Sequence, residues 1–281
     1  CFTGSEIWTD RTGQFRTKAG CEKMKLDDIF DNASERPLDN IPPDGGYTAI
    51  FRTVACIGDS LSSGEFEAAA EKGSSYHDMY EYSWGQFMAR MCGCKVYNMS
   101  RGGMTAKEYW EKFADANGYW NPSYAAQCYI IALGVNDLFG KKQEVGIADD
   151  IDSPDPARMT FAYYYAHIIE RLKKIQPRAK FFLMTMPRGD EDDGKQELRR
   201  AHRELIHAFA EKYDNTYVLD FFEYALRYDA EFRRNFYMRG HMNPAGYLLT
   251  AKMTAAYIDY IIRHNMRDFR EVGFIGTDLH A

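Results

Sequence analysis

The sequence predicts one α/β domain in which a parallel sheet of five strands lies between two layers of helices. From residue 49 onward, short apolar runs alternate with longer amphipathic stretches, as in domains built from strand–helix–strand units. The run 128–133 is apolar throughout, which is typical of a strand buried on both faces. The 281 residues suffice for one large domain, whereas a second full domain would be cramped. We therefore expect a three-layer α/β/α sandwich.

Strands and helices are expected in alternation along the chain. The predicted strands are the apolar runs 53–57, 95–98, 128–133, 180–186 and 216–219. The predicted helices cover about 81–92, 105–116, 158–175, 193–213 and 244–264. In the segment 158–175, apolar residues recur at helical spacing, as Phe161, Tyr165, Ile168 and Leu172 show. Pro244 begins the last helix, where its missing N–H costs no hydrogen bond.

Residues 1–48 differ from the rest of the chain. They are polar, show no sustained periodicity and end in a stretch rich in proline and glycine. We expect an N-terminal extension, with one short helix near Lys25–Phe30, that packs on the domain formed by residues 49–281. Because this extension leads directly into the first strand, it is expected to border the edge of the sheet that carries the site.

Composition and charge exclude several classes of protein. The formal net charge of -6 and the lack of a Lys/Arg block argue against a nucleic-acid partner. No stretch of about 18 apolar residues predicts a membrane span. An acidic stretch around Asp149–Asp155 lacks the glycine and glutamate of a calcium-binding loop, and no phosphate-binding loop motif occurs. We expect neither a metal nor a cofactor.

Six cysteines are present, at positions 1, 21, 56, 92, 94 and 128. Cys56 and Cys128 lie in apolar runs expected to be buried strands, and Cys92-Gly-Cys94 lacks the spacing of a C-x-x-C motif. We therefore favour reduced thiols over disulfides, and a cytoplasmic location. Because the chain begins with Cys1 rather than Met, a removed signal peptide, and with it secretion, stays open.

Polar residues follow the predicted strands where they leave the sheet. The segments are 58–61, 98–105, 134–137 and, before the last helix, 240–247. In open parallel sheets, ligands bind beyond the carboxyl ends of the strands. Ser60 is a candidate nucleophile and His241 a candidate general base, because a serine hydroxyl needs a neighbouring base. The N–H groups of Ser60 and Gly103 and the Asn136 amide could stabilise an oxyanion.

These four segments resemble the sequence blocks of the SGNH hydrolase family, also called GDSL esterases. Gly-Asp-Ser-Leu is intact at 58–61 and Gly-x-Asn-Asp at 134–137, while Ser100 replaces the usual first glycine of the second block. The family's Ser, Gly, Asn and His match Ser60, Gly103, Asn136 and His241. The resemblance covers residues 53 to about 262. It implies a flavodoxin-like sandwich and hydrolysis of acyl esters, often acetyl groups on carbohydrate.

One position departs from the family pattern. The family usually carries an aspartate three residues before the histidine, and Met238 stands there in this chain. His241 could work in a Ser–His dyad, or a carboxylate from elsewhere could orient it; Asp220 and Glu223 are the candidates, because they follow the fifth strand. We favour these two explanations over a third, a weakened site, because the other elements are present.

Other polar residues near the blocks are expected to have structural rather than catalytic roles. Asp59 is expected to shape the nucleophile loop and Asp137 to cap the segment that follows it. Glu65 and Glu67 could line the mouth of the pocket, but we favour their interpretation as solvated side chains. The histidines of the charged helix, His202 among them, are interpreted as surface residues.

We expect a serine esterase that acts on O-acyl esters, with a short acyl group, favoured as acetyl, on a carbohydrate. A cluster of aromatic residues between positions 109 and 124 could stack on a sugar or pack in the core. Two alternatives stay open: an O-acyltransferase that uses the same site, and a weakly active carbohydrate-binding protein on the same scaffold. The sequence does not give the oligomeric state.

Overall fold

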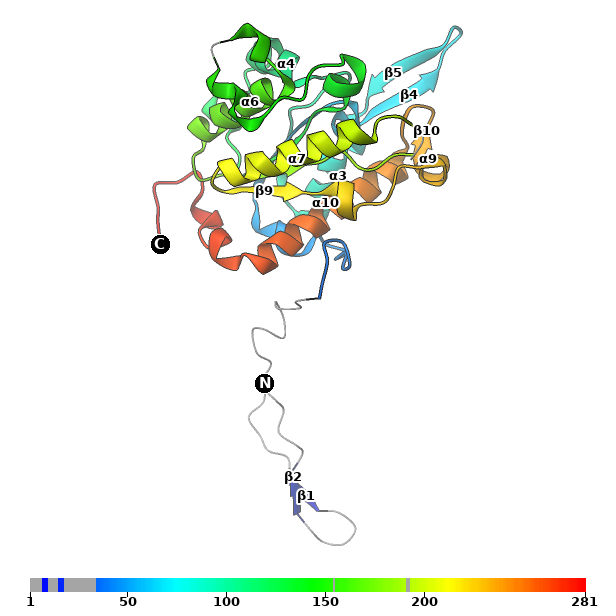
Figure 1. Ribbon diagram of the computed structural model, residues 1–281. Helices are drawn as coiled ribbons and strands as arrows, with labels where there is room; N and C mark the ends of the chain where they lie inside the picture. Colours follow the sequence, from blue (N-terminus) through cyan, green and yellow to red (C-terminus); the bar gives the residue numbers. More distant parts are fainter. Residues whose placement is uncertain (1–6, 10–14, 18–33, 154, 191–192) are drawn as a thin grey trace. The chain divides into compact units, whose positions relative to one another are not determined.

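The computed structural model describes residues 7–9, 15–17, 34–153, 155–190 and 193–281. By its contacts, the chain forms two units, Cys1–Glu35 and Arg36–Ala281. In the first unit, strands β1 (Ile7–Thr9) and β2 (Phe15–Thr17) pair antiparallel. The short helix predicted near Lys25–Phe30 lies outside the described residues. The second unit carries all of the features discussed below (Figure 1).

A parallel sheet of five strands forms the centre of the second unit. Its strands are β6 (Lys95–Asn98), β3 (Thr53–Gly58), β7 (Cys128–Ala132), β8 (Lys180–Met184) and β9 (Thr216–Leu219), in that spatial order. Neighbouring strands pair in parallel throughout. The second strand in the chain lies outside the first, and the others follow on the opposite side, as in flavodoxin-like folds. The predicted fold class and the positions of the five strands are confirmed.

Helices cover both faces of this sheet. On one face lie α3 (Trp84–Cys92) and α10 (Pro244–His264). On the other lie α6 (Phe161–Ile175), α7 (Gln196–Lys212) and a continuous helical segment made of α4 (Ala106–Glu108), η3 (Tyr109–Phe113) and α5 (Ala114–Ala116). Because side chains alternate along a strand, each strand supplies apolar side chains to both layers.

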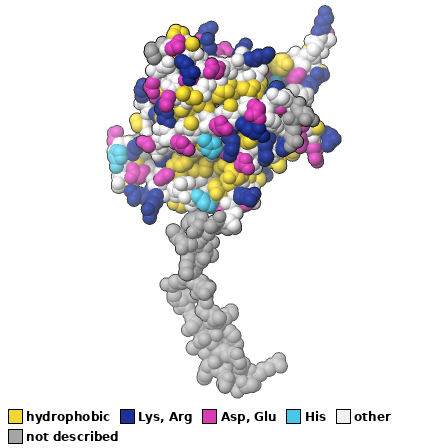
Figure 2. All heavy atoms as spheres, viewed as in Figure 1, with side chains coloured by type: hydrophobic (Ala, Val, Ile, Leu, Met, Phe, Trp, Pro, Cys, Tyr) yellow, Lys and Arg dark blue, Asp and Glu magenta, His cyan; other side chains and the backbone are white. Residues whose placement is uncertain are grey.

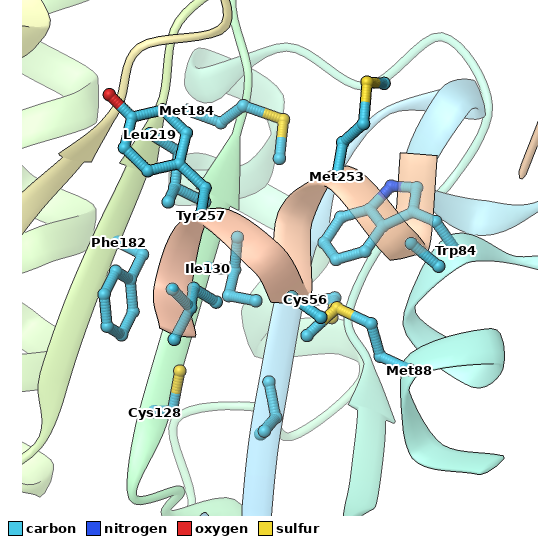
Figure 3. Close-up of a cluster of buried hydrophobic side chains, with 14 of the residues drawn as sticks. Cys56, Trp84, Met88, Cys128, Ile130, Phe182, Met184, Leu219, Met253 and Tyr257 are labelled. Carbon is cyan, nitrogen blue, oxygen red and sulfur yellow. The ribbon is translucent and has the colours of Figure 1, made fainter. Parts of the chain in front are cut away.

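The layer beneath α3 and α10 is a continuous apolar core. Figure 3 shows Trp84 of α3 and Met253 of α10 over the strand residues Cys56, Ile130 and Phe182. All five side chains are buried. On the face drawn in Figure 2, Lys and Arg side chains lie among Asp and Glu side chains. In the part of the chain that the structure describes, no helix combines the length and apolar character that crossing a membrane requires.

Several elements were not predicted from the sequence. The antiparallel strands β4 (Glu65–Ala69) and β5 (Ser74–Asp78) form a hairpin that extends beside β10 in Figure 1. The short helices α8 (Phe221–Tyr224) and α9 (Ala230–Phe236) follow β9, and β10 (Tyr237–Met238) pairs with β11 (His241–Met242). The remaining short helical elements are α2 (Ser60–Ser63), η1 (Gly46–Ile50), η2 (Tyr80–Tyr82), η4 (Pro122–Tyr124), η5 (Asn136–Gly140), η6 (Ala148–Asp152), η7 (Pro156–Arg158), η8 (Met266–Phe269) and η9 (Val272–Phe274).

The compact unit begins before the predicted start of the α/β domain at residue 49. The N–H of Tyr47 donates to Asp259 Oδ1 at 2.7 Å, and the Thr48 hydroxyl donates to the carbonyl of Ala255 at 2.7 Å. These bonds attach η1 to α10, so residues 36–48 belong structurally to the unit that contains the sheet.

The four cysteines among the described residues carry free thiols. Cys56, Cys92, Cys94 and Cys128 are all buried. Burial raises the pKa of the Cys92 thiol to about 12, which keeps it protonated and unreactive. The reduced-thiol prediction is therefore confirmed for these four positions.

Candidate active site

Ser60 lies at the point where β3 ends and helix α2 begins. Asp59 caps this helix: its Oδ1 atom accepts the N–H of Leu61 at 3.0 Å, and its carbonyl accepts the N–H groups of Ser62 and Ser63. These bonds fix the turn that carries Ser60, as the structural interpretation of Asp59 requires. Burial raises the pKa of the Asp59 carboxyl to about 6.

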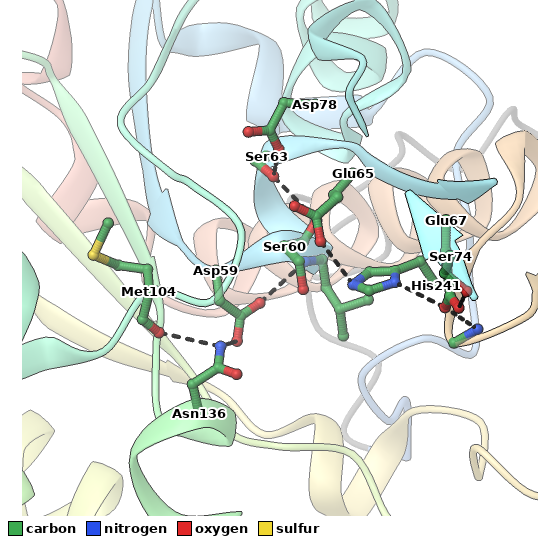
Figure 4. Close-up of polar contacts among 12 residues, drawn as sticks. Asp59, Ser60, Ser63, Glu65, Glu67, Ser74, Asp78, Met104, Asn136 and His241 are labelled. Carbon is green, nitrogen blue, oxygen red and sulfur yellow. Dashed lines mark hydrogen bonds and ion pairs between the residues drawn. The ribbon is translucent and has the colours of Figure 1, made fainter. Parts of the chain in front are cut away.

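Asn136 links the turn of Ser60 to the loop after β6. Its Nδ2 atom donates to Asp59 Oδ2 at 3.3 Å and to the carbonyl of Met104 at 3.2 Å (Figure 4). The neighbouring Gly103 has φ +71°, a left-handed conformation that favours glycine. The structure thus brings the predicted oxyanion residues Ser60, Gly103 and Asn136 to the same end of the sheet.

Asp137 also connects two of the sequence blocks. Its Oδ1 atom accepts the N–H of Ala106 at 2.8 Å, so it supports the start of the helical segment at 106–116 rather than the segment that follows it. Its Oδ2 atom is buried and has no hydrogen-bond partner among the described residues. Burial raises the pKa of this carboxyl to about 7.

His241 lies on β11, directly before the start of α10, and a carboxylate faces each of its ring nitrogens. Its Nε2 atom lies 3.1 Å from Glu65 Oε1. Its Nδ1 atom is buried and lies 3.7 Å from Glu67 Oε2, too far for a hydrogen bond, and it has no hydrogen-bond partner among the described residues. The exposed ring of Tyr76 meets the imidazole edge-on, with 5.6 Å between centroids. In Figure 4, Ser60 lies between Asn136 and His241.

Both carboxylates come from strand β4. Residues two apart on a strand point to the same side, so Glu65 and Glu67 face His241 together while Phe66 packs on Tyr247 in the core. Each of the two Glu side chains is only 13% exposed. Their interpretation as solvated side chains is wrong. The alternation Glu-Phe-Glu at 65–67 is the sequence signal that could have revealed the strand.

Glu67 is held firmly in place. Ser74 donates its hydroxyl to Oε1 at 2.5 Å, and the N–H of Gly240 donates to Oε2 at 2.7 Å. The Ser74 and Gly240 hydrogen bonds hold the pKa of the Glu67 carboxyl below its usual value. Glu67 is therefore an ionised group that ties the hairpin to the turn before His241.

Glu65 has a different environment. Burial raises the pKa of its carboxyl, an effect that the nearby His241 opposes. Its other oxygen lies against Gly102, where an added Cβ atom would come within 1.9 Å of Oε2. Glu65 therefore fills the space between the imidazole and the glycine loop.

Neither carboxylate expected to orient His241 does so in this structure. Asp220 caps α8 and accepts hydrogen bonds at Oδ2 from Arg203 at 2.7 Å and His207 at 3.0 Å. Glu223, on the same helix, lies 3.9 Å from Arg203. The physical reason is that both carboxylates face α7, where Arg203 and His207 engage them.

The surface interpretation of His202 is also wrong. This side chain is fully buried, and its Nε2 atom lies 3.1 Å from the carbonyl of Leu133. Burial lowers the pKa of His202 to about 4, so it is neutral near pH 7. It packs against the backbone of Gly134, where a Cβ atom would come within 2.8 Å of the imidazole.

Ser60, Asn136 and His241 line one cavity of about 380 Å³. Its other walls include the apolar and aromatic side chains of Leu61, Val135, Phe139, Met186, Tyr228 and Tyr237. The aromatic cluster at 109–124 does not line this cavity: Tyr109 and Trp120 are buried in the core beneath α6. Of the two interpretations of that cluster, core packing is therefore the one that the structure supports.

Comparison with known proteins agrees with this geometry. The family model described as the GDSL-like lipase/acylhydrolase family matches residues 56–249. The chain belongs to this family. The match includes both Ser60 and His241, and membership makes this GDSL-like protein a carboxylic ester hydrolase. No curated protein matches the chain.

Among the solved structures that share this fold are two carbohydrate esterases. A family two carbohydrate esterase from Clostridium thermocellum in complex with cellohexaose is 17% identical, with a TM-score of 0.53; the match covers 77% of this chain and 65% of that chain. An active-site mutant of a family two carbohydrate esterase from the same organism is 16% identical, with a TM-score of 0.51, and the match covers 77% and 64%. The GDSL-like chain thus spans less than two thirds of the length of these esterases.

Proposed function

We propose that this GDSL-like hydrolase cleaves O-acyl esters through Ser60, with His241 as general base, and that its substrate carries a short acyl group, favoured as acetyl, on a carbohydrate. The observation that supports this most is the common cavity lined by Ser60, Asn136 and His241. A nucleophile, a base and an oxyanion donor that face one cavity are what acyl transfer requires.

The reaction proceeds in two halves. Ser60 Oγ attacks the acyl carbon while His241 takes the hydroxyl proton, and a tetrahedral intermediate forms. The bond to the sugar oxygen breaks as His241 returns the proton to that oxygen, which leaves an acyl-enzyme. Water, deprotonated by His241, then attacks the acyl carbon, and the proton passes to Ser60 as the carboxylic acid leaves.

The oxyanion is stabilised by the N–H groups of Ser60 and Gly103 and by the Asn136 amide. In the substrate-free site, both Asn136 donors are used by Asp59 and Met104. A developing oxyanion replaces Asp59 or Met104 as the acceptor of one of these N–H groups. The hydrogen bonds that can be replaced are long, at 3.3 Å to Asp59 and 3.2 Å to Met104.

Glu67 serves as the positioning carboxylate in place of the missing aspartate. It faces Nδ1, the nitrogen that the aspartate of a triad contacts, and it is ionised and anchored. Met238, at the family's aspartate position, is instead 42% exposed. Glu65 occupies Nε2 in the substrate-free site, so its carboxylate must move away before Nε2 accepts the proton of Ser60.

The carbohydrate part of the proposal rests on two arguments. The structural relative from Clostridium thermocellum is a carbohydrate esterase in complex with cellohexaose, and it shares this fold. Tyr228 and Tyr237 also line the cavity of Ser60, and aromatic rings offer a sugar ring an apolar face.

The test compares the wild-type protein with Ser60→Ala on two esters. Acetate release is measured from p-nitrophenyl acetate and from an acetylated cello-oligosaccharide, with and without unacetylated oligosaccharide as acceptor. We expect Ser60-dependent release from both, with a higher kcat/KM for the sugar ester.

Each other outcome removes one part of the proposal. Equal rates for wild type and Ser60→Ala would contradict hydrolysis through Ser60. Activity on the nitrophenyl ester alone would contradict the proposal that the substrate is a carbohydrate ester. Transfer of acetyl groups to the acceptor in place of release would show an acyltransferase, and sugar binding without Ser60-dependent turnover would show a binding protein.

A further inference from the structure

A second, smaller cavity adjoins the cavity of Ser60 and His241. Its volume is about 60 Å³, and it lies on the side of the sheet covered by α3 and α10. The two cavities share the wall residues Asp59, Leu61, Val135, Met186, Pro187 and Tyr228. The small cavity therefore begins directly beside the turn that presents Ser60.

The deeper wall of this cavity is apolar. It is formed by Trp84 of α3, Ala132 of β7, Met184 of β8, Phe221 of α8 and Met242 of β11. In Figure 3, Trp84 and Met184 lie on the same side of the sheet. Methionine side chains are flexible, so this wall adapts to the shape of an apolar group.

Four polar side chains of the wall, those of Asp59, Ser62, Thr185 and Thr250, have hydrogen-bond partners within the protein. Ser62 shares a hydrogen bond of 2.9 Å with Ser100, and Thr250 donates to the carbonyl of Gly246 at 3.0 Å. Thr185 donates to Asp220 at 3.1 Å and accepts the N–H of Phe222 at 2.9 Å. A cavity whose polar groups are satisfied gives water few hydrogen bonds, and it favours an apolar occupant.

We infer that this small cavity binds the acyl chain of the ester, and that it sets an upper limit of about four carbons on that chain. The inference rests on the proposed function, because the acyl carbon must lie at Ser60. An apolar cavity of about 150 Å³ holds the six carbons of benzene. By proportion, a cavity of about 60 Å³ holds two to three carbons beyond the carbonyl, as in propionyl and butyryl groups.

Two substitutions on the apolar wall test this limit from opposite directions. Ala132→Val narrows the cavity and Met184→Ala lengthens it. The measurement is kcat/KM for p-nitrophenyl acetate, butyrate and hexanoate. One methylene in an apolar pocket changes specificity by about 10–200-fold. We expect Ala132→Val to lower the butyrate-to-acetate ratio at least tenfold, and Met184→Ala to raise the hexanoate-to-butyrate ratio at least tenfold.

Met253→Ala is the matched control. Met253 is buried in the same core but does not line the cavity, so its loss leaves a comparable void without changing the acyl site. Its chain-length profile should equal that of the wild type. Thermal unfolding of all three variants checks that they fold.

Two results overturn the inference in distinguishable ways. Ser60-dependent hydrolysis with chain-length ratios within twofold of wild type in both cavity variants, or with equal changes in Met253→Ala, would show that the acyl chain binds elsewhere. If no ester is hydrolysed in a Ser60-dependent manner, the proposed function fails, and the acyl site fails with it.

Discussion

Glu67 Oε2 lies 3.7 Å from the Nδ1 atom of His241, although the two residues belong to separate hairpins. A hydrogen bond also joins the two hairpins at this point, because Glu67 Oε2 accepts the N–H of Gly240, the residue before His241. A carboxylate on β4 thus stands where the family usually supplies one from the histidine block. Ser60, His241 and Glu67 therefore form a candidate triad that substitutions can test.

Glu67→Gln should lower kcat for p-nitrophenyl acetate by about 10²–10⁴-fold with little change in KM. The amide fills the same space but does not stabilise the imidazolium that forms when His241 takes the serine proton; the corresponding change in a protease costs about 10⁴-fold. Steady-state kinetics checks this. Glu71→Gln, an exposed substitution in the turn of the same hairpin, is the control. A loss below threefold would leave a Ser–His dyad.

Glu65→Ala should raise the rate at which a fluorophosphonate labels Ser60 severalfold. Glu65 occupies Nε2, because its Oε1 atom lies 3.1 Å from this nitrogen. Removing the carboxylate frees this nitrogen for Ser60, whereas Glu65→Gln keeps an oxygen there and should give a smaller increase. The labelling rate is measured at saturating probe. A tenfold decrease in Glu65→Ala would show instead that this carboxylate assists the reaction.

Asn136→Ala should lower kcat about 10²–10³-fold, the usual cost of one oxyanion donor. The substitution also removes the bond to Asp59 Oδ2, so the melting temperature must be measured beside the rate. Asn117→Ala, at an exposed position, controls for the loss of an amide elsewhere. Equal losses in both variants, or a loss explained by unfolding, would exclude Asn136 as a donor.

Asp137→Asn should stabilise the protein at high pH and much less at low pH. The folded-state pKa of Asp137 is about 7, above the usual 3.8, so the unfolded chain releases this proton first. Stability therefore falls as pH rises from about 4 to 7, and the whole loss is in place above pH 7. With about 1.4 kcal/mol per pKa unit, the advantage of the variant should grow by about 3 kcal/mol between pH 5 and pH 8. Urea unfolding at the two pH values measures it; an advantage independent of pH would contradict the raised pKa.

The sheet could be predicted because its signal is local. Runs such as 128–133 are apolar at successive positions, and both faces of the observed strand are indeed covered. Three of the four polar segments follow strands, and their proximity follows from the fold, since the carboxyl ends of parallel strands lie at one edge of the sheet. The fourth segment, which holds His241, precedes the last helix. Ser60, Gly103 and Asn136 were predicted from the strand ends and His241 from its position before the last helix, and Ser60, Asn136 and His241 line one cavity.

The residues around His241 could not be predicted, because their role depends on tertiary contacts. Strand β4 is five residues long and carries two charged residues, so its periodicity is short and its propensity low. The neighbours of His202 include Arg199 and Arg203, which suggest a solvated helix face, yet Arg199 is itself buried against Asp193. Asp220 was a reasonable candidate by chain order, but its carboxylate is bonded to Arg203 and His207 of α7.

Peptide mapping after fluorophosphonate labelling tests the central claim most directly. The account predicts one adduct, on the peptide that contains Ser60, in the wild-type protein. It also predicts that the adduct is lost in Ser60→Ala and forms far more slowly in His241→Ala. An adduct on another serine, such as the neighbouring Ser62, or equal labelling of wild type and Ser60→Ala, would contradict a nucleophile at Ser60.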